Sequence, residues 1–378
     1  MILESDSSIA IRPRVSQLGE QIRDLDFAAK MVVAHTPDRY TNTVDFFDQA
    51  MIYSARRVQP RSQIRARVIR IGVTECHVEL STAVVQRGDA VLDISPGERE
   101  SLVEKALRKL ACEPGDSRRA VAVDGKGTPR LRVKFTLSEL RRSLTVVGHN
   151  FKLSELREAL VVLMRCSLVL RVEQPDGKTF RELEGTILQN LVVTGNTADP
   201  SDGNTFFTVS FHPAIEGGLL ACTFRRIDYE ILLKLKSDLA RWLYLRISHN
   251  YRQAEARALV DPKLRYHLSL KTIIADRGEL TSATRQRDVL RAVRSAFEEL
   301  VAAGLIFPPI LVSNVAIKVG RGRKGRADVI FHVAGTQKLI DDIVEANRAS
   351  RAMHQAKALA ATTFEVKVRQ SEPLALLC

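Results

Sequence analysis

The order of apolar and polar positions predicts strands and then a helix in the first part of the chain. Residues 62–80 alternate apolar and polar, as half-buried strands do, with a turn near Thr74. A change of parity between Val68 and Ile69 predicts a β-bulge, because an extra residue re-aims the side chains that follow it. Residues 97–112 then carry apolar side chains three or four apart, which predicts a helix.

Two further helices and several strands follow. Residues 133–144 predict a short strand and a helix, in which Thr136 and Glu139 stand in the order of a capping box. Residues 151–169 predict a second helix. Three apolar runs predict strands, the first two of them joined by a turn at 175–177: 168–174, 186–193 and 205–211.

The second half repeats this order. Residues 224–249 predict one long helix, and residues 269–278 predict a short helix with Ser269 as its N-cap and Gly278 as its end. Residues 281–307 predict a third helix. Two strands, 306–319 and 327–333, are joined by a glycine-rich turn and predict a β-hairpin.

Helix, short helix, long helix and hairpin is the order of a winged helix, which is a helix-turn-helix followed by a strand pair. The chain is therefore predicted to be α+β, with tandem winged-helix domains at 61–221 and 222–335. Residues 1–60 are predicted to be a weakly structured N-terminal extension with at most one amphipathic helix. Residues 336–378 predict a helical tail that packs on the second domain or on a partner.

The charge of the chain is concentrated in the second of these domains. The formal net charge is +13, and residues 222–335 carry 21 Lys and Arg against 11 Asp and Glu, an excess of 10. A generally basic protein would spread its excess evenly along the chain. Concentration in one domain predicts that this domain binds a polyanion.

Arginines follow one side of the helix predicted at 281–307. At about 100° per residue, its apolar residues form one sector, while Arg287, Arg291 and Arg294 align in another, with Arg285 near the N-terminus. The second helix of a helix-turn-helix presents such side chains to base edges in the major groove. The alternative is a solvated face with helical ion pairs, for which Asp288 and Glu298 are the available partners.

The turn of the second hairpin is rich in glycine and cations. Glycines permit a sharp bend and a close approach to another backbone. Its cations predict contacts with phosphates or with a minor groove: Arg321, Arg323, Lys324 and Arg326. The alternative is a plain exposed turn.

The first unit has fewer candidate contacts. Its helix at 151–169 exposes a mixed face with Glu155, Glu158 and Arg165, so this unit is predicted to bind DNA less strongly or to serve partly for dimerisation. Its candidate DNA contacts are Arg141, Arg142, Lys152 and Arg157. Further candidate phosphate contacts lie just before them: Arg130, Arg132 and Lys134.

Catalytic and metal-binding patterns are missing from the sequence. The eight histidines show no HExxH or HxH spacing, and the five cysteines include no CxxC pair, so we expect no enzyme activity, cofactor, metal site or disulfide framework. No run of about 18 apolar residues and no secretory signal occurs. We expect a cytoplasmic protein without a membrane anchor.

In pattern and order, the chain resembles the iteron-binding plasmid replication initiators, most closely their TrfA-like group. The first winged helix of these proteins is similar to "RARVIRIGVTECHVELSTAVV", "LVEKALRKL" and "VKFTLSELRRSL". The second is similar to "RRIDYEILLKLKSDLARWLYLRISHN" followed by "HLSLKTIIADRGELTSATRQRDVLRAVRSAFEELVAAGLI". The chain departs from the group in lacking a clear clamp-binding peptide within its first 60 residues and in continuing well past the second recognition helix.

The resemblance implies binding to repeated sequences (iterons) in double-stranded origin DNA, opening of adjacent AT-rich DNA, and recruitment of the host initiator, helicase and sliding clamp. It implies DNA contacts for Arg285, Arg287, Arg291 and Arg294. A homodimer is a further possibility. The alternative function is a sequence-specific winged-helix repressor or autoregulator that does not melt an origin.

Overall fold

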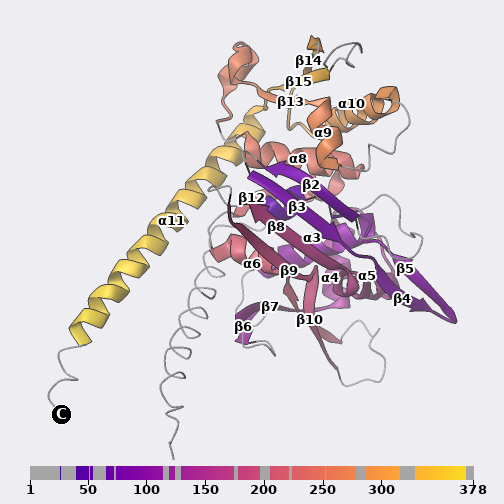
Figure 1. The fold of residues 1–378 in the computed structure, drawn as a ribbon, viewed down its shortest axis with the longest axis vertical. Helices are drawn as coiled ribbons and strands as arrows, with labels where there is room; N and C mark the ends of the chain where they lie inside the picture. Colours follow the sequence, from indigo (N-terminus) through magenta and orange to yellow (C-terminus); the bar gives the residue numbers. More distant parts are fainter. Residues whose placement is uncertain are drawn as a thin grey trace, which may run out of the picture.

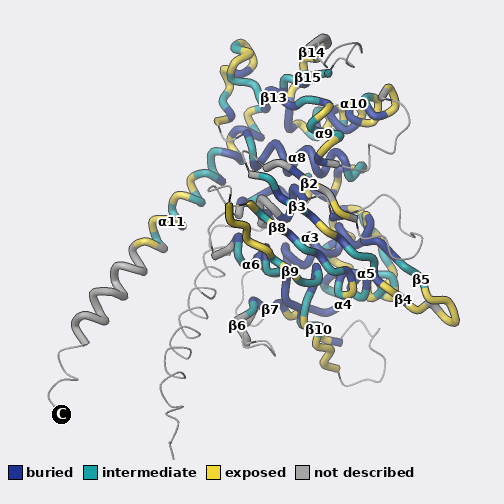
Figure 2. Tube along the Cα trace, viewed as in Figure 1, coloured by how far each residue is buried: buried dark blue, intermediate teal, exposed yellow. Residues whose placement is uncertain are grey.

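The structure of this chain is a computed structural model. It describes residues 26, 40–50, 52–53, 65–71, 74–113, 119–123, 129–173, 178–195, 205–220, 224–251, 253–277, 286–315 and 328–371. The described part is α+β, with helices set among several small antiparallel sheets (Figure 1). Its buried apolar side chains form one continuous cluster that runs through both halves of the chain. Figure 2 shows that buried residues occur along both halves.

The first half is rich in strands. Its helices are α2 (Asp45–Gln49), α3 (Glu98–Cys112), α4 (Leu137–Val146), α5 (Leu153–Arg165) and α6 (Pro213–Leu220). Its strands are β1 (Tyr40–Val44), β2 (Arg65–Ile71), β3 (Thr74–Leu80), β4 (Ala83–Arg87), β5 (Ala90–Ile94), β6 (Arg119–Val123), β7 (Pro129–Thr136), β8 (Ser167–Glu173), β9 (Phe180–Thr186), β10 (Leu188–Thr194) and β11 (Phe206–Phe211).

The second half contains fewer strands and the longest described helix. Its helices are α7 (Tyr229–Lys234), α8 (Asp238–Asn250), the 3-10 turns η2 (Ala256–Leu259) and η3 (Pro262–Leu264), α9 (Leu270–Arg277), α10 (Gln286–Ala302) and α11 (Gln337–Ser371). Its strands are β12 (Phe224–Asp228), β13 (Tyr266–Ser269), β14 (Ile310–Val315) and β15 (Asp328–Val333).

Two groups of elements share one topology. Each runs helix, strand, helix, helix and hairpin: α3, β7, α4, α5, β10 and β11 in the first unit, and α8, β13, α9, α10, β14 and β15 in the second unit. In both sheets the last strand of the hairpin lies in the middle, in the orders β10-β11-β7 and β14-β15-β13. The two units are thus built alike, and the first carries one extra edge strand, β6.

Additional strands are inserted into the first unit. A separate sheet has the order β2-β3-β8-β9, and β4 and β5 form a hairpin of their own. The predicted bulge at Val68 and Ile69 is wrong, because β2 pairs with β3 in unbroken register. The run at 168–174 and the run at 186–193, which the sequence places on either side of one turn, are not partners: β8 pairs with β9, and β10 joins the other sheet.

The helix predicted at 224–249 is wrong as a single element. The apolar spacing continues through it, but the chain forms β12, α7 and α8, with Leu235 in an extended conformation. Two polar side chains divide this segment, because each caps the start of a new helix. Asp228 Oδ1 accepts the Ile231 N–H at 3.0 Å, and Ser237 Oγ accepts the Ala240 N–H at 3.1 Å.

Part of the predicted N-terminal extension belongs to the core. β1 pairs antiparallel with β12, from Tyr40 opposite Asp228 to Val44 opposite Phe224. Phe47 and Ile52 are buried. The weakly structured extension predicted at 1–60 is therefore wrong for residues 40–50 and 52–53, while the amphipathic helix predicted within it lies outside the described residues except for Asp26.

The predicted helical tail is present as α11, and its first half packs on the body of the protein. Leu339, Ile340 and Ile343 are buried, and α11 contacts β12. The Tyr40 hydroxyl donates to Asp342 Oδ1 at 2.7 Å. The far end of α11 extends away from the body (Figure 1).

Candidate nucleic-acid interface

Helix α10 has one buried and one basic side. Its apolar stripe is buried, namely Val289, Val293, Ala296, Phe297 and Leu300. Arg287, Arg291 and Arg294 are all exposed. The predicted amphipathic division of this helix is confirmed by these burials, while Arg285 lies outside the described residues.

One of these three described arginines, Arg291, forms an ion pair. Arg291 Nη2 donates to Asp288 Oδ1 at 2.8 Å, and both side chains are largely exposed, at 70% and 46%. An exposed helical ion pair stabilises a protein by about 1 kcal/mol or less, because water screens both charges. A phosphate or a guanine edge can therefore replace Asp288 as the partner of Arg291 at small cost.

A carboxylate ties α10 to α8, and a cap fixes the start of the preceding helix α9. Glu299 Oε2 accepts the N–H groups of Lys236 (2.8 Å) and Ser237 (3.0 Å) and so ties α10 to the start of α8. Ser269 caps α9 by accepting the Thr272 N–H at 3.0 Å, as the sequence predicted. The basic side of α10 is thus carried on a fixed frame.

The hairpin that follows α10 is attached to the same frame. β14 and β15 pair antiparallel, which confirms the predicted hairpin. At the start of β15, next to the turn of the hairpin, Asp328 Oδ1 accepts the Lys271 N–H at 3.1 Å and thereby links the hairpin to the first turn of α9. The tip of this hairpin, with Arg321, Arg323, Lys324 and Arg326, lies outside the described residues.

The candidate cations of the first unit surround the turn between α4 and α5. Arg141 and Arg142 are exposed on α4, and Lys152 and Arg157 are exposed at the start of α5. The capping box predicted for α4 is confirmed: the Glu139 N–H donates to Thr136 Oγ1, and the Thr136 N–H donates to Glu139 Oε2.

Several other charges of the first unit have structural partners. Arg130 Nη1 donates to Glu216 Oε2 at 2.8 Å, so its side chain is held inside the fold. Glu158 pairs with Arg99 at 2.6 Å. Lys134 is exposed and lies over the ring of Phe206, 4.2 Å from its centroid.

Buried arginines account for part of the positive charge in residues 222–335. Arg241 pairs with Glu98, and Arg246 pairs with Asp276 at 2.5 Å; both arginines are buried. These two side chains contribute to the charge excess of residues 222–335 but not to the charge of its surface. The net charge of a segment gives no signal that separates them from Arg287, Arg291 and Arg294.

Metal-binding clusters and membrane-spanning helices are absent from the described residues. There, no group of three His, Cys, Asp or Glu is placed to hold a metal ion. No helix in this part of the chain is long and apolar enough to cross a membrane. Cys76, Cys112 and Cys166 are buried free thiols.

Comparisons with known proteins give distant structural similarities. No protein-family model matches the chain, and no curated protein matches its sequence. The chain is similar to a crystal structure of domains 2 and 3 of RctB, with a TM-score of 0.43 and 13% identity over 80% of this chain and 99% of that chain. It is also similar to the Pi initiator protein in complex with iteron DNA, with a TM-score of 0.37 and 15% identity over 63% of this chain and 94% of that chain.

Proposed function

We propose that the chain is a non-catalytic plasmid replication initiator of the TrfA-like kind, built on two tandem winged helices. It binds iterons in double-stranded origin DNA, promotes opening of the adjacent AT-rich segment and recruits the host initiator, helicase and sliding clamp. It acts in the cytoplasm without a cofactor, as a monomer or a homodimer. The observation that carries the proposal is the exposed arginine row on α10 within a topology that occurs twice.

Each unit supplies the parts of a winged helix. In the second unit α9 and α10 are the helix-turn-helix, and β14 and β15 are the wing. The recognition helix of this motif enters the major groove, where arginine donates two hydrogen bonds to guanine O6 and N7. Arg287, Arg291 and Arg294 are assigned this role or contacts with the flanking phosphates.

The first unit supplies a second, weaker contact. Exposed cations at a helix-turn-helix contact the DNA backbone as often as the bases. Contacts with phosphates are therefore assigned to the four exposed cations of this unit: Arg141, Arg142, Lys152 and Arg157. DNA contacts are also assigned, as proposed from the sequence, to Arg285 and to the hairpin cations Arg321, Arg323, Lys324 and Arg326.

A transcriptional repressor built from the same modules is the second candidate. Footprinting on supercoiled DNA that contains the flanks of this gene, combined with a single-strand-specific chemical probe, separates the two. Protected repeats beside reactive thymines support an initiator. Protected repeats without reactive thymines leave the repressor, and protection of no sequence contradicts both.

A further inference from the structure

A short N-terminal segment bridges the two units. This segment, the strap, comprises β1, α2, Ile52 and Tyr53. β1 pairs with β12 just ahead of the second unit and contacts α3 of the first. α2 packs against α8 of the second unit. The strap therefore lies between the two units and contacts both.

The strap holds the first unit by a buried ionic contact. Two hydrogen bonds join Arg108 of α3 to Asp48, from Nη2 to Oδ1 at 2.6 Å and from Nη1 to Oδ2 at 2.8 Å. Arg108 Nε also lies 2.5 Å from Glu104 Oε1. The side chains of Asp48 and Arg108 are each 2% exposed. Burial alone would raise the pKa of Asp48, but the Arg108 guanidinium holds it below its ordinary value.

The strap holds the second unit through α8. Thr43 Oγ1 lies 2.9 Å from His249 Nε2, and Asn250 Nδ2 donates to Gln49 Oε1 at 3.1 Å. Both partners stand in the last turn of α8. The strap is therefore held to both units by specific hydrogen bonds as well as by apolar packing.

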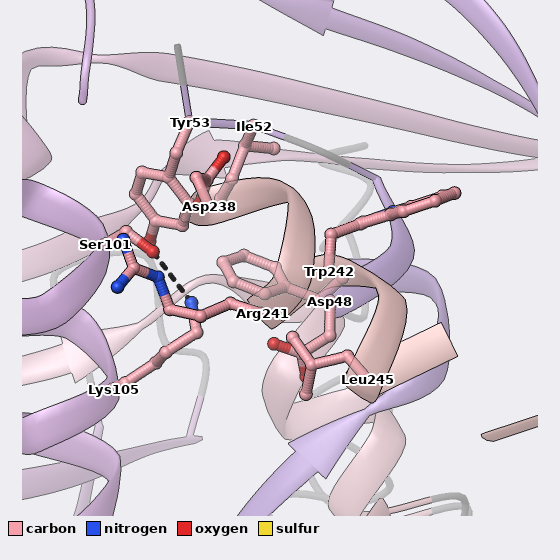
Figure 3. A pocket seen from close by; sticks show the side chains of 10 residues that line it. Asp48, Ile52, Tyr53, Ser101, Lys105, Asp238, Arg241, Trp242 and Leu245 are labelled. Carbon is pink, nitrogen blue, oxygen red and sulfur yellow. Dashed lines mark hydrogen bonds between the residues drawn. The ribbon is translucent and has the colours of Figure 1, made fainter. Parts of the chain in front are cut away.

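A pocket marks the point where the three parts meet (Figure 3). Tyr53 comes from the strap, Lys105 from α3, and Arg241 and Trp242 from α8. Lys105 Nζ donates to Ser101 Oγ at 2.9 Å and lies 5.0 Å from the centroid of the Tyr53 ring. Strap, first unit and second unit thus share one junction.

We propose that the strap fixes the relative orientation of the two units and thereby sets the separation of the two DNA elements that they contact. A paired guanidinium and carboxylate fix an angle as well as a distance, because both hydrogen bonds must form at once. The units also touch directly, since Arg241 of α8 pairs with Glu98 of α3. The strap adds two contacts to this one, Asp48 with Arg108 on the first unit and Thr43 with His249 on the second. The DNA part of the inference rests on the proposed function, whereas the orientation does not.

The orientation is measured without DNA, as the distance between spin labels in the two units. Labels at Thr145→Cys in α4 and Ser295→Cys in α10 stand at exposed positions, in a chain whose Cys222 and Cys378 are changed to serine. The remaining three thiols are buried. Burial raises the pKa of Cys76 and Cys166 to about 12, which keeps them unreactive.

We expect one narrow distance distribution for the parent chain and a broadened one for Asp48→Asn, which loses the charge but keeps the side-chain size. Thr43→Val tests the other end of the strap by a milder change. The matched control is Glu182→Gln, because Glu182 pairs with Arg171 at 2.6 Å on an exposed sheet. Circular dichroism checks that each variant is folded. An unchanged distribution in folded Asp48→Asn and Thr43→Val overturns the inference.

The consequence for DNA is measured on the protected repeat with about 5 base pairs inserted at its centre, which turns its halves to opposite sides of the duplex. We expect the insertion to weaken binding of the parent chain about tenfold or more, and that of Asp48→Asn by clearly less. Equal weakening in both overturns the DNA part. Broadened distances in a chain that binds no DNA support the strap while contradicting the proposed function.

Discussion

The ring of Phe297 in α10 lies 4.8 Å from the ring of Phe331 in β15, centroid to centroid, and both residues are buried. The helix that carries the exposed arginines and the central strand of the β13-β15-β14 sheet therefore share one core. This contact fixes how far the basic side of α10 stands from the hairpin of β14 and β15.

Phe297→Ala is expected to lower the free energy of unfolding by about 3 to 5 kcal/mol, because it leaves a cavity at this contact. Urea denaturation measures the change. Phe307→Ala is the matched control, since Phe307 is 38% exposed and leaves no enclosed cavity. Equal losses for the two variants would show that the Phe297 contact has no special role.

His212 joins two parts of the first half as a neutral ring. Its Nδ1 accepts the Ala214 N–H at 3.1 Å, so its Nε2 carries the proton and donates to the Leu168 carbonyl at 3.1 Å. Burial lowers the pKa of His212 from 6.5 to about 4. The charged form of the ring would carry a second proton on Nδ1, and this proton would point at the Ala214 N–H. The two donors would repel each other, which disfavours the charged ring further.

Stability is therefore expected to fall in acid. The unfolded chain takes up a proton on this histidine below about pH 6.5, while the folded chain does so only near pH 4. As the pH falls between these two values, proton uptake by His212 in the unfolded chain is expected to lower the free energy of unfolding by up to about 3 kcal/mol. Denaturation at several pH values measures this as the difference between the parent chain and His212→Gln. His354→Gln, on an exposed histidine, should keep the full pH dependence; the same dependence in His212→Gln would contradict the assignment.

Asp288→Asn is expected to tighten binding to duplex DNA by about 0.5 to 1 kcal/mol at low salt. The change removes a negative charge from the proposed DNA surface and releases Arg291 from its ion pair. Fluorescence anisotropy with a labelled duplex measures it. Glu182→Gln is the control, because Glu182 forms a solvent-accessible pair with Arg171 between β8 and β9. Weaker binding by Asp288→Asn would indicate that the pair positions Arg291 instead of competing for it.

Local signals predicted much of the fold. The capping box of Thr136 and Glu139 and the cap at Ser269 depend on side chains within three residues, and both are present. The hairpin of β14 and β15 follows from apolar strands around a glycine-rich turn. These features need no knowledge of distant contacts.

The features that the sequence did not predict depend on distant partners. Thr43 and Asp48 look like surface residues until His249 and Arg108 are placed beside them. The same holds for Arg241, whose partner Glu98 lies in the first unit. The amphipathic stripe predicted which side of α10 is exposed, because helical periodicity separates its faces, but it does not say what the exposed arginines bind.

Binding of the protected repeat by Arg291→Ala is the sharpest test of whether α10 reads DNA bases. Anisotropy is measured against a labelled repeat and a scrambled duplex of the same length, with Arg348→Ala as a control that removes one exposed arginine from α11. We expect Arg291→Ala to weaken binding to the repeat by about 1 to 3 kcal/mol while binding to the scrambled duplex changes little, and Arg348→Ala to bind as the parent chain does. Unchanged affinity of Arg291→Ala for the repeat, with only a shallower dependence on salt, would contradict base reading by this arginine.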